Sequence, residues 1–237
     1  MTFLDLERLS QIDPSSFQSQ KPYPWINPGG LLTEEGYRRL REALPDVSQL
    51  APDFGRHRMH GQRSHDRFSL EYSDELDVDD AWKEFASELR DQPYRDFLSR
   101  MLGVRRFGLN FHWHYTPNGC SVSPHCDARR KLGSHIFYLN TEDDWDPAWG
   151  GETLVLDDGG EFRRNTAPQF DDFTQVMPSR TVGNHSFLFA QTTHSWHGVR
   201  EIRCPKDRMR KVFIVVVNRH SPIVRARRWF RKMPTWY

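Results

Sequence analysis

Residues 208–218 read Arg-Met-Arg-Lys-Val-Phe-Ile-Val-Val-Val-Asn and contain the longest apolar run of the chain, 212–217. β-Branched and aromatic side chains favour extended backbone, so this run predicts a buried strand that basic residues precede. Gly, Pro, Asn and Asp bound four more short segments of this kind, with no helical pattern between them. These segments are 107–115, 134–140, 152–157 and 186–191. Short strands in succession predict a sandwich or a barrel.

The first 103 residues have a different pattern. Residues 1–30 are rich in turn formers and are predicted to be an extended or irregular lead-in. Thr33 can cap a helix that runs to about residue 43, and 79–102 has helical apolar spacing, with a break expected at Pro93. The polar residues 51–66 are predicted to be a loop. We therefore expect a mainly β (α+β) protein with an N-terminal helical layer packed on its β core.

Length and composition fit one domain in a reducing compartment. The 237 residues divide into helical support (1–103), a β core (104–219) and a basic, aromatic tail (220–237). Lysine and arginine number 33 against 32 acidic residues, so no overall field favours nucleic acid. The run 212–217 is far shorter than the roughly 20 residues of a membrane span. No secretory signal pattern is present, and the three cysteines form no C-x-x-C pair, so a cytoplasmic protein is expected.

The strongest local signal for chemistry is His125-Cys126-Asp127. On a strand, alternation sends His125 and Asp127 to one face and Cys126 to the other. One imidazole and one carboxylate on one face are two metal ligands, and a distant histidine would complete the two-His-one-carboxylate site of Fe(II) oxygenases. We favour His197 over His194 as that third ligand, and expect His185 to be a surface or turn residue.

A keto acid chelated by such an iron needs a cation for its far carboxylate. Arginine suits this role because its guanidinium binds a carboxylate with two parallel hydrogen bonds. Arg208 and Arg210 both stand at the entrance of the strand predicted from 212–217. The alternative is that both charges simply face solvent.

Six short motifs occur in one order along residues 104–219. They are Tyr115-Thr-Pro-Asn-Gly119, Pro124-His-Cys-Asp127, Tyr138-Leu-Asn140, Gly150-Gly-Glu-Thr153, His197-Gly-Val199 and Arg210 before an apolar strand. In this order the chain resembles the prolyl 4-hydroxylase-like superfamily of Fe(II)- and 2-oxoglutarate-dependent dioxygenases. The resemblance implies a double-stranded β-helix (jelly-roll, cupin-like) core, with Fe²⁺, 2-oxoglutarate and O₂ as cofactor and co-substrates.

The same resemblance assigns residues to roles. It makes His125, Asp127 and His197 the iron ligands, and it places Tyr138 and Tyr115 near 2-oxoglutarate. Either Arg208 or Arg210 would hold the far carboxylate. We favour Arg210, although Val212 stands where the family often has Ser or Thr.

The reaction implied is hydroxylation of a C–H bond, because Asp127 fills the position that related halogenases leave open for halide. Arg129 and Arg130, which follow Asp127, are candidate contacts to a small or lipid-linked, anionic substrate such as an acidic sugar or acyl chain. Trp113 is a further candidate. A peptidyl or free amino-acid hydroxylase is the first alternative, and a non-catalytic, cupin-like metal-binding module is the second.

Three further expectations concern surfaces and faces. The tail 222–237 mixes arginines with aromatic residues, which suits peripheral contact with an anionic membrane at its inner face, whereas nucleic acid is disfavoured.

The long segment 157–181 is either a lid or a plain loop. Because Tyr115 is expected to face the pocket, His112 and His114 are expected to face away from it.

Overall fold

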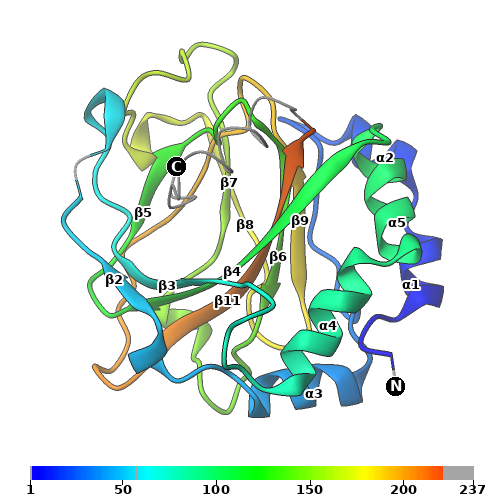
Figure 1. Cartoon of the computed structure of the whole chain (residues 1–237). Coiled ribbons are helices and arrows are strands. Elements are labelled where there is room, and N and C mark those ends of the chain that lie inside the picture. The colour runs from blue at the N-terminus through cyan, green and yellow to red at the C-terminus, as the bar shows by residue number, and fades with distance from the viewer. Residues whose placement is uncertain (1, 57, 221–237) are drawn as a thin grey trace, which may run out of the picture.

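Two antiparallel sheets form the body of the protein. The computed structural model describes residues 2–56 and 58–220, and Figure 1 shows the helices gathered along one side of the larger sheet. The larger sheet has the strand order β1 (Trp25–Ile26), β9 (Ser186–Ala190), β6 (Lys131–Tyr138), β11 (Met209–Arg219), β4 (Phe107–Pro117), β3 (Arg67–Glu71) and β2 (Ala51–Asp53). The smaller sheet has the order β5 (Val122–His125), β10 (His197–Val199), β7 (Leu154–Asp157) and β8 (Gln175–Pro178). This confirms a mainly β fold with N-terminal helices.

The apolar strand β11 lies in the middle of the larger sheet. It pairs with β4 along its whole length, from Met209↔Pro117 to Arg219↔Phe107, and with β6 on its other edge. Its odd-numbered residues, such as Phe213, pack against the helices, and its even-numbered residues, such as Val212, face the smaller sheet. Both faces of β11 are therefore buried, which explains why its sequence is apolar without alternation.

The helices cover the outer face of the larger sheet. They are α1 (Leu6–Gln11), α2 (Pro14–Ser19), α3 (Glu34–Glu42), α4 (Asp80–Arg90) and α5 (Gln92–Leu102). Thr33 caps α3 as predicted, because its hydroxyl accepts a hydrogen bond from the backbone N–H of Gly36. The predicted helix 79–102 is broken at Asp91, two residues before Pro93. No helix among the described residues has the length and apolar character needed to cross a membrane.

The N-terminal part is more ordered than its composition indicates. Residues 1–30 were predicted to be irregular, but they contain α1, α2 and β1. Asp5 and Asp13 cap the two helices, and Pro14 occupies the first turn of α2. The predicted loop 51–66 begins with β2, so three strands from the first 103 residues extend the larger sheet. The tail from 221 onward lies outside the described residues.

Asp158 anchors the segment that follows β7. Its carboxylate accepts hydrogen bonds from the indole of Trp196 and from the backbone N–H of Phe162, and it lies 2.9 Å from Nδ1 of His194. Phe162 and Phe173 then pack on the Trp196 ring. The segment 157–181, left open as a lid or a loop, is therefore folded against the smaller sheet and contributes β8 to it.

We expect Asp158→Asn to lower the free energy of unfolding by about 1–3 kcal/mol at neutral pH, because three N–H donors, those of Gly160, Phe162 and Trp196, and an imidazole lose a charged acceptor. Burial alone would raise the pKa of Asp158, but its hydrogen bonds, that of His194 first, hold the pKa below 3.8. A depressed pKa stabilises the fold at pH values above the unfolded value, and this contribution disappears as the pH falls through the folded value.

Thermal unfolding of wild type and Asp158→Asn between pH 3 and pH 7 checks this. The difference in melting temperature between the two proteins should be largest at neutral pH and should shrink below about pH 4. An equal difference at every pH would contradict the assigned role of the Asp158 charge.

Candidate active site

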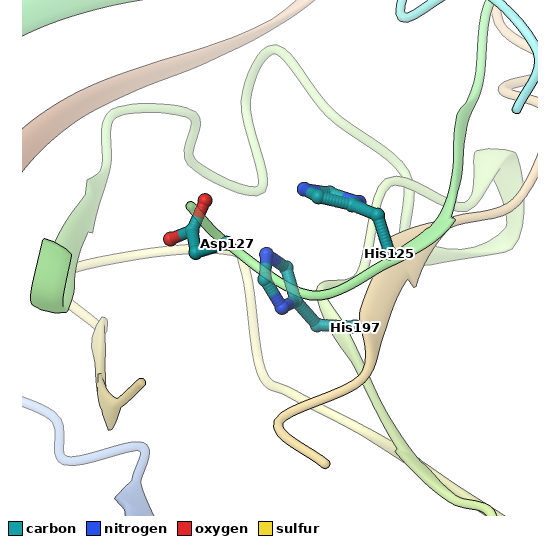
Figure 2. A group of neighbouring side chains, drawn as sticks. All are labelled: His125, Asp127 and His197. Carbon is teal, nitrogen blue, oxygen red and sulfur yellow. The ribbon is translucent and has the colours of Figure 1, made fainter. Parts of the chain in front are cut away.

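Two histidines and one aspartate converge between the two sheets. Their ligand atoms lie within 4.8 Å of one another, and Figure 2 shows the two imidazole rings and the carboxylate directed toward a common centre. Ligand atoms on one ion at about 2.1 Å lie at most roughly twice that far apart, so small side-chain rotations close the set on a metal. The three residues are His125, Asp127 and His197.

Strand pairing brings the two histidines together. His125 ends β5 and His197 begins β10, and the two residues are paired directly, with ring centroids 4.3 Å apart. Asp127 lies beyond the end of β5, in the turn before β6. The predicted reason for its position, alternation along one strand, is therefore wrong, although the residue itself reaches the site.

Each imidazole is held in the tautomer that a metal needs. Nδ1 of His125 lies 2.9 Å from the carbonyl oxygen of Ser123, and Nδ1 of His197 lies 2.9 Å from that of Ser195. A carbonyl only accepts, so both Nδ1 atoms carry the proton and both Nε2 lone pairs are free to bind a metal. Burial lowers the pKa of both histidines, which keeps them neutral as ligands must be.

The Asp127 carboxylate is ionised and held in place. Lys131 Nζ lies 2.6 Å from its Oδ1, and the Ser134 hydroxyl donates to Oδ2 at 3.2 Å. Burial alone would raise the pKa of Asp127, but Lys131 and the neighbouring imidazoles hold it well below the ordinary value. Since a carboxylate oxygen can accept from more than one partner, Asp127 still has lone pairs that can bind a metal.

The other candidate ligands lie elsewhere. His194 bonds to Asp158, and His185 lies 3.0 Å through Nδ1 from the carbonyl of Val182. The Cys126 thiol contacts the carbonyl of Thr193 and packs beside the Trp196 cluster. The donor set among the described residues is thus two neutral imidazoles and one carboxylate, which fits Fe(II) with open positions for further ligands.

A buried cation lies near these three residues. The guanidinium of Arg210 donates from Nε to the carbonyl of Gly151 at 2.5 Å and from Nη2 to Thr153 Oγ1 at 3.1 Å. Its side chain lies over the Tyr138 ring, whose hydroxyl also donates to Thr153. No aspartate or glutamate of the described residues forms an ion pair with Arg210, although the residue is only 6% exposed. A buried charge without a partner of opposite sign costs free energy, which an anionic ligand would offset.

Strand β7 sets the separation between this cation and the three residues. His197 pairs with Val155 of β7, and Thr153, which contacts Arg210, lies two residues before Val155, next to the first residue of β7. Two residues of a strand span about 7 Å, a distance of the order that a five-carbon dicarboxylate bridges. Arg208, in contrast, has a side chain 43% exposed and lies 3.6 Å from Asp207.

The comparison with known families agrees with this geometry. Residues 110–216, which include all three converging residues and Arg210, match the model of the 2OG-Fe(II) oxygenase superfamily. This segment, which carries the donor set, belongs to the superfamily. The protein is therefore an enzyme, with Fe(II) as its metal and 2-oxoglutarate as its co-substrate, and His125, Asp127 and His197 form the facial triad. No curated protein matches the chain in sequence.

Three solved structures share the fold of this protein. A prolyl-4-hydroxylase from Pseudomonas putida superposes with a TM-score of 0.60 at 16% identity, covering 88% of this chain and 99% of that one. A prolyl hydroxylase from Trichoplax adhaerens, solved with a hypoxia inducible factor peptide, gives 0.58 at 13% identity, with 90% of each chain covered. The carbocyclase SnoK from nogalamycin biosynthesis gives 0.60 at 11% identity, covering 89% and 85%. Such low identities establish the double-stranded β-helix fold alone.

Two aromatic residues predicted for the oxygenase pocket lie on the helix side of the larger sheet. The hydroxyl of Tyr115 donates to the carbonyl of Pro45, and the ring belongs to the core beneath the helices. Trp113 is fully buried there against Trp82 and Phe213. The predicted orientation of β4 was therefore inverted, because its aromatic face supplies the apolar surface on which the helices pack. Neither residue can contact 2-oxoglutarate or substrate from that side.

Two histidines face the interior instead: His114, which was wrongly predicted to face away from the pocket, and His65, which the sequence interpretation did not single out. His114 pairs with Val212, whose side chain points inward, and its pKa is lowered by burial and then by the charge of Arg67. The His65 ring lies beside that of His125, with ring centroids 4.5 Å apart and the planes tilted by 52°. Burial lowers the pKa of His65 strongly, with smaller contributions from His125 and Arg58. The signal for His114 was the alternation of β4, once its aromatic face had been assigned to the helices.

The predicted substrate contacts Arg129 and Arg130 lie in the turn between Asp127 and β6. The carbonyls of both residues accept hydrogen bonds from Arg219 at the end of β11. Arg129 is exposed and lines a cavity with Arg164 and Arg219. Their role toward substrate stays a prediction.

Proposed function

We propose that this oxygenase hydroxylates a C–H bond of a small or lipid-linked, anionic substrate, such as an acidic sugar or acyl chain of a membrane glycolipid precursor. The observation that carries the use of 2-oxoglutarate is the buried Arg210 guanidinium, which contacts Thr153 just before β7 and has no acidic partner among the described residues. The anionic substrate is supported separately, by arginines on another side of the triad. With 2-oxoglutarate and O₂, the iron supplies oxidative decarboxylation of the keto acid to succinate and CO₂, coupled to insertion of one oxygen atom into the substrate.

The residues of the chain bind and orient the reactants. Arg210 would bind the far carboxylate of 2-oxoglutarate with two parallel hydrogen bonds, and the Tyr138 hydroxyl, held by Thr153 and Ser179, would lie beside it. Lys131 and Ser134 fix the orientation of the Asp127 carboxylate, so that the ligand does not rotate as reactants enter. Phe189, whose ring lies 4.5 Å from that of His197, shields this side from water.

Positive charge on the loop side of the triad supports an anionic substrate. Burial lowers the pKa of Arg58, and the negative charges of Asp53 and Asp127 act in the opposite direction. The positive charges of Arg58 and Arg67 both lower the pKa of His65 beside the triad. Burial lowers the pKa of Arg67 to about 10, and its Nε atom is buried without a hydrogen-bond partner among the described residues. Because Arg67 already pairs with Asp53 at 3.3 Å, the charge that a negatively charged substrate would offset is mainly that of Arg58.

A peptidyl or free amino-acid hydroxylase is the second candidate. It is favoured by the similarity to two prolyl hydroxylases over about nine tenths of the chain. The superposition with a carbocyclase of antibiotic biosynthesis at the same TM-score shows that this architecture also serves other reactions, so the choice rests on the charge of the pocket.

Location is part of the proposal. We place the oxygenase in the cytoplasm, in peripheral contact with the inner face of the membrane through 222–237, where the sequence mixes basic and aromatic residues. Nucleic acid is not a proposed partner, because the net charge is only +1.

The test is succinate formation from 2-oxoglutarate by the iron-loaded protein in the presence of substrate panels. Acidic sugars, acyl chains and proline-containing peptides form the three panels, and mass spectrometry detects products that gain one oxygen atom. We expect stimulation of succinate formation by the anionic compounds. Stimulation by prolyl peptides alone would favour the second candidate, and iron binding without any succinate would indicate a non-catalytic metal-binding module.

A further inference from the structure

Three arginines from distant parts of the chain line one cavity behind the Asp127 turn. Arg129 follows β5, Arg164 belongs to the segment after β7, and Arg219 ends β11. The cavity has a volume of about 430 Å³. Gln191, Thr192 and Thr193 complete its lining.

The cavity is rich in hydrogen-bond donors and has no acidic lining residue. None of the three arginines forms an ion pair with an aspartate or glutamate within residues 2–56 and 58–220. Bringing like charges together costs free energy, which an anion in the cavity would offset. Guanidiniums, hydroxyls and a carboxamide all offer N–H or O–H groups to an acceptor with several oxygens.

Arg164 has an unused donor at this place. Its Nη2 donates to the carbonyl oxygen of Asp127, but its Nη1 is buried and has no hydrogen-bond partner among the described residues. An unsatisfied charged donor that is out of contact with water costs free energy unless a ligand accepts from it.

We infer that this cavity binds a phosphate group of the substrate. The inference deepens the proposed function and rests on it, because it names the anion that the hydroxylated molecule carries. A phosphate fits better than a carboxylate, since its oxygens point in several directions and can accept from three separate guanidiniums. A carboxylate presents only two oxygens in one plane.

The site is connected to the metal centre through the backbone. Arg164 and Gln191 both donate to the carbonyl oxygen of Asp127, whose side chain belongs to the triad. A phosphate that fixes Arg164 therefore also fixes the turn that carries a metal ligand. By linkage, the phosphate should strengthen metal binding by the same factor by which the metal strengthens phosphate binding.

The first test is a calorimetric titration of the full chain, freed of metal, with inorganic phosphate. Metal-free protein is used so that phosphate cannot bind through iron. Arg164→Gln and Arg219→Gln should each weaken binding by about 10-fold or more, because each removes one charged donor. Glutamine at 164 can still donate to the Asp127 carbonyl, which protects the fold.

Arg203→Gln is the matched control, since the Arg203 side chain is 83% exposed and is not part of the cavity lining. It should bind phosphate as the wild type does. Equal affinity of wild type, Arg164→Gln and Arg219→Gln would overturn the inference, and so would a wild-type protein that binds no phosphate.

Two further arms distinguish the sources of the phosphate. Glycerol phosphate tests a soluble ester, and phosphatidylcholine vesicles containing phosphatidic acid test a lipid headgroup. Binding in either arm that is lost in Arg164→Gln supports the site and identifies its source, and binding in neither arm overturns it. Wild-type protein that forms succinate but binds no phosphate refutes this inference alone, whereas phosphate binding without succinate refutes the proposed function.

Discussion

Replacing Arg210 by glutamine is expected to raise the KM for 2-oxoglutarate by roughly 100-fold to 4000-fold. Removing one partner of a buried charged pair costs about 3–5 kcal/mol, and each 1.4 kcal/mol is a factor of ten. The effect should be this large because Arg210 is buried and its nearest partners are a carbonyl and hydroxyls rather than a carboxylate. Steady-state succinate formation at varied 2-oxoglutarate concentration measures it.

Arg208→Gln provides the control for this experiment. Arg208 stands two residues away, but its side chain is 43% exposed and its nearest acidic group is Asp207. Its replacement should leave the KM within about twofold, as expected for an exposed ion pair. A large increase for Arg208→Gln together with an unchanged KM for Arg210→Gln would reverse the assignment of the anchor.

Replacing His197 by alanine is expected to abolish Fe(II) binding. A facial triad has three protein ligands, and the loss of one imidazole leaves a carboxylate and a single histidine. The smaller sheet should stay folded, since β10 pairs with β5 and β7 through its backbone. Anaerobic dialysis against Fe(II), followed by iron analysis, gives the stoichiometry for each variant.

His194→Ala is the matched control, because His194 lies three residues earlier on the same segment and bonds to Asp158. It should retain one iron per chain while losing some thermal stability. If His194→Ala lost the metal and His197→Ala retained it, the assignment of the third ligand would be refuted.

The strands of the core could be predicted because their signal is local. β4, β6, β7, β9 and β11 each carry a run of apolar residues, many of them β-branched or aromatic, between turn formers. β2 has no such run, since its three residues include Pro52, and it forms only because β3 offers an edge. Short edge strands of this kind depend on tertiary pairing, which no local pattern records.

The orientation of a strand proved harder to predict than its existence. The alternation of β4 showed that Phe111, Trp113 and Tyr115 share one face, but not which layer that face meets. The helices packed on this sheet direct rings such as that of Trp82 toward it, and these rings bury the aromatic side of β4. The polar side, with His112 and His114, is left to face the interior of the fold.

The triad was predicted from residue types and spacing, and its local geometry differs from the reason first given. His125 ends its strand, so Asp127 reaches the metal position through a turn that Lys131 and Arg164 hold. Arg164 could not be predicted as a neighbour of Asp127, because 36 residues separate the two in the sequence. Contacts across such a separation become visible only once the sheets are assembled.

A crystal structure of the protein grown without oxygen, with Fe(II) and 2-oxoglutarate, tests the central claim most directly. The account predicts one iron bonded to Nε2 of His125, Nε2 of His197 and a carboxylate oxygen of Asp127, with the far carboxylate of 2-oxoglutarate on Arg210. Iron bonded to other side chains, or 2-oxoglutarate bound away from Arg210, would contradict it.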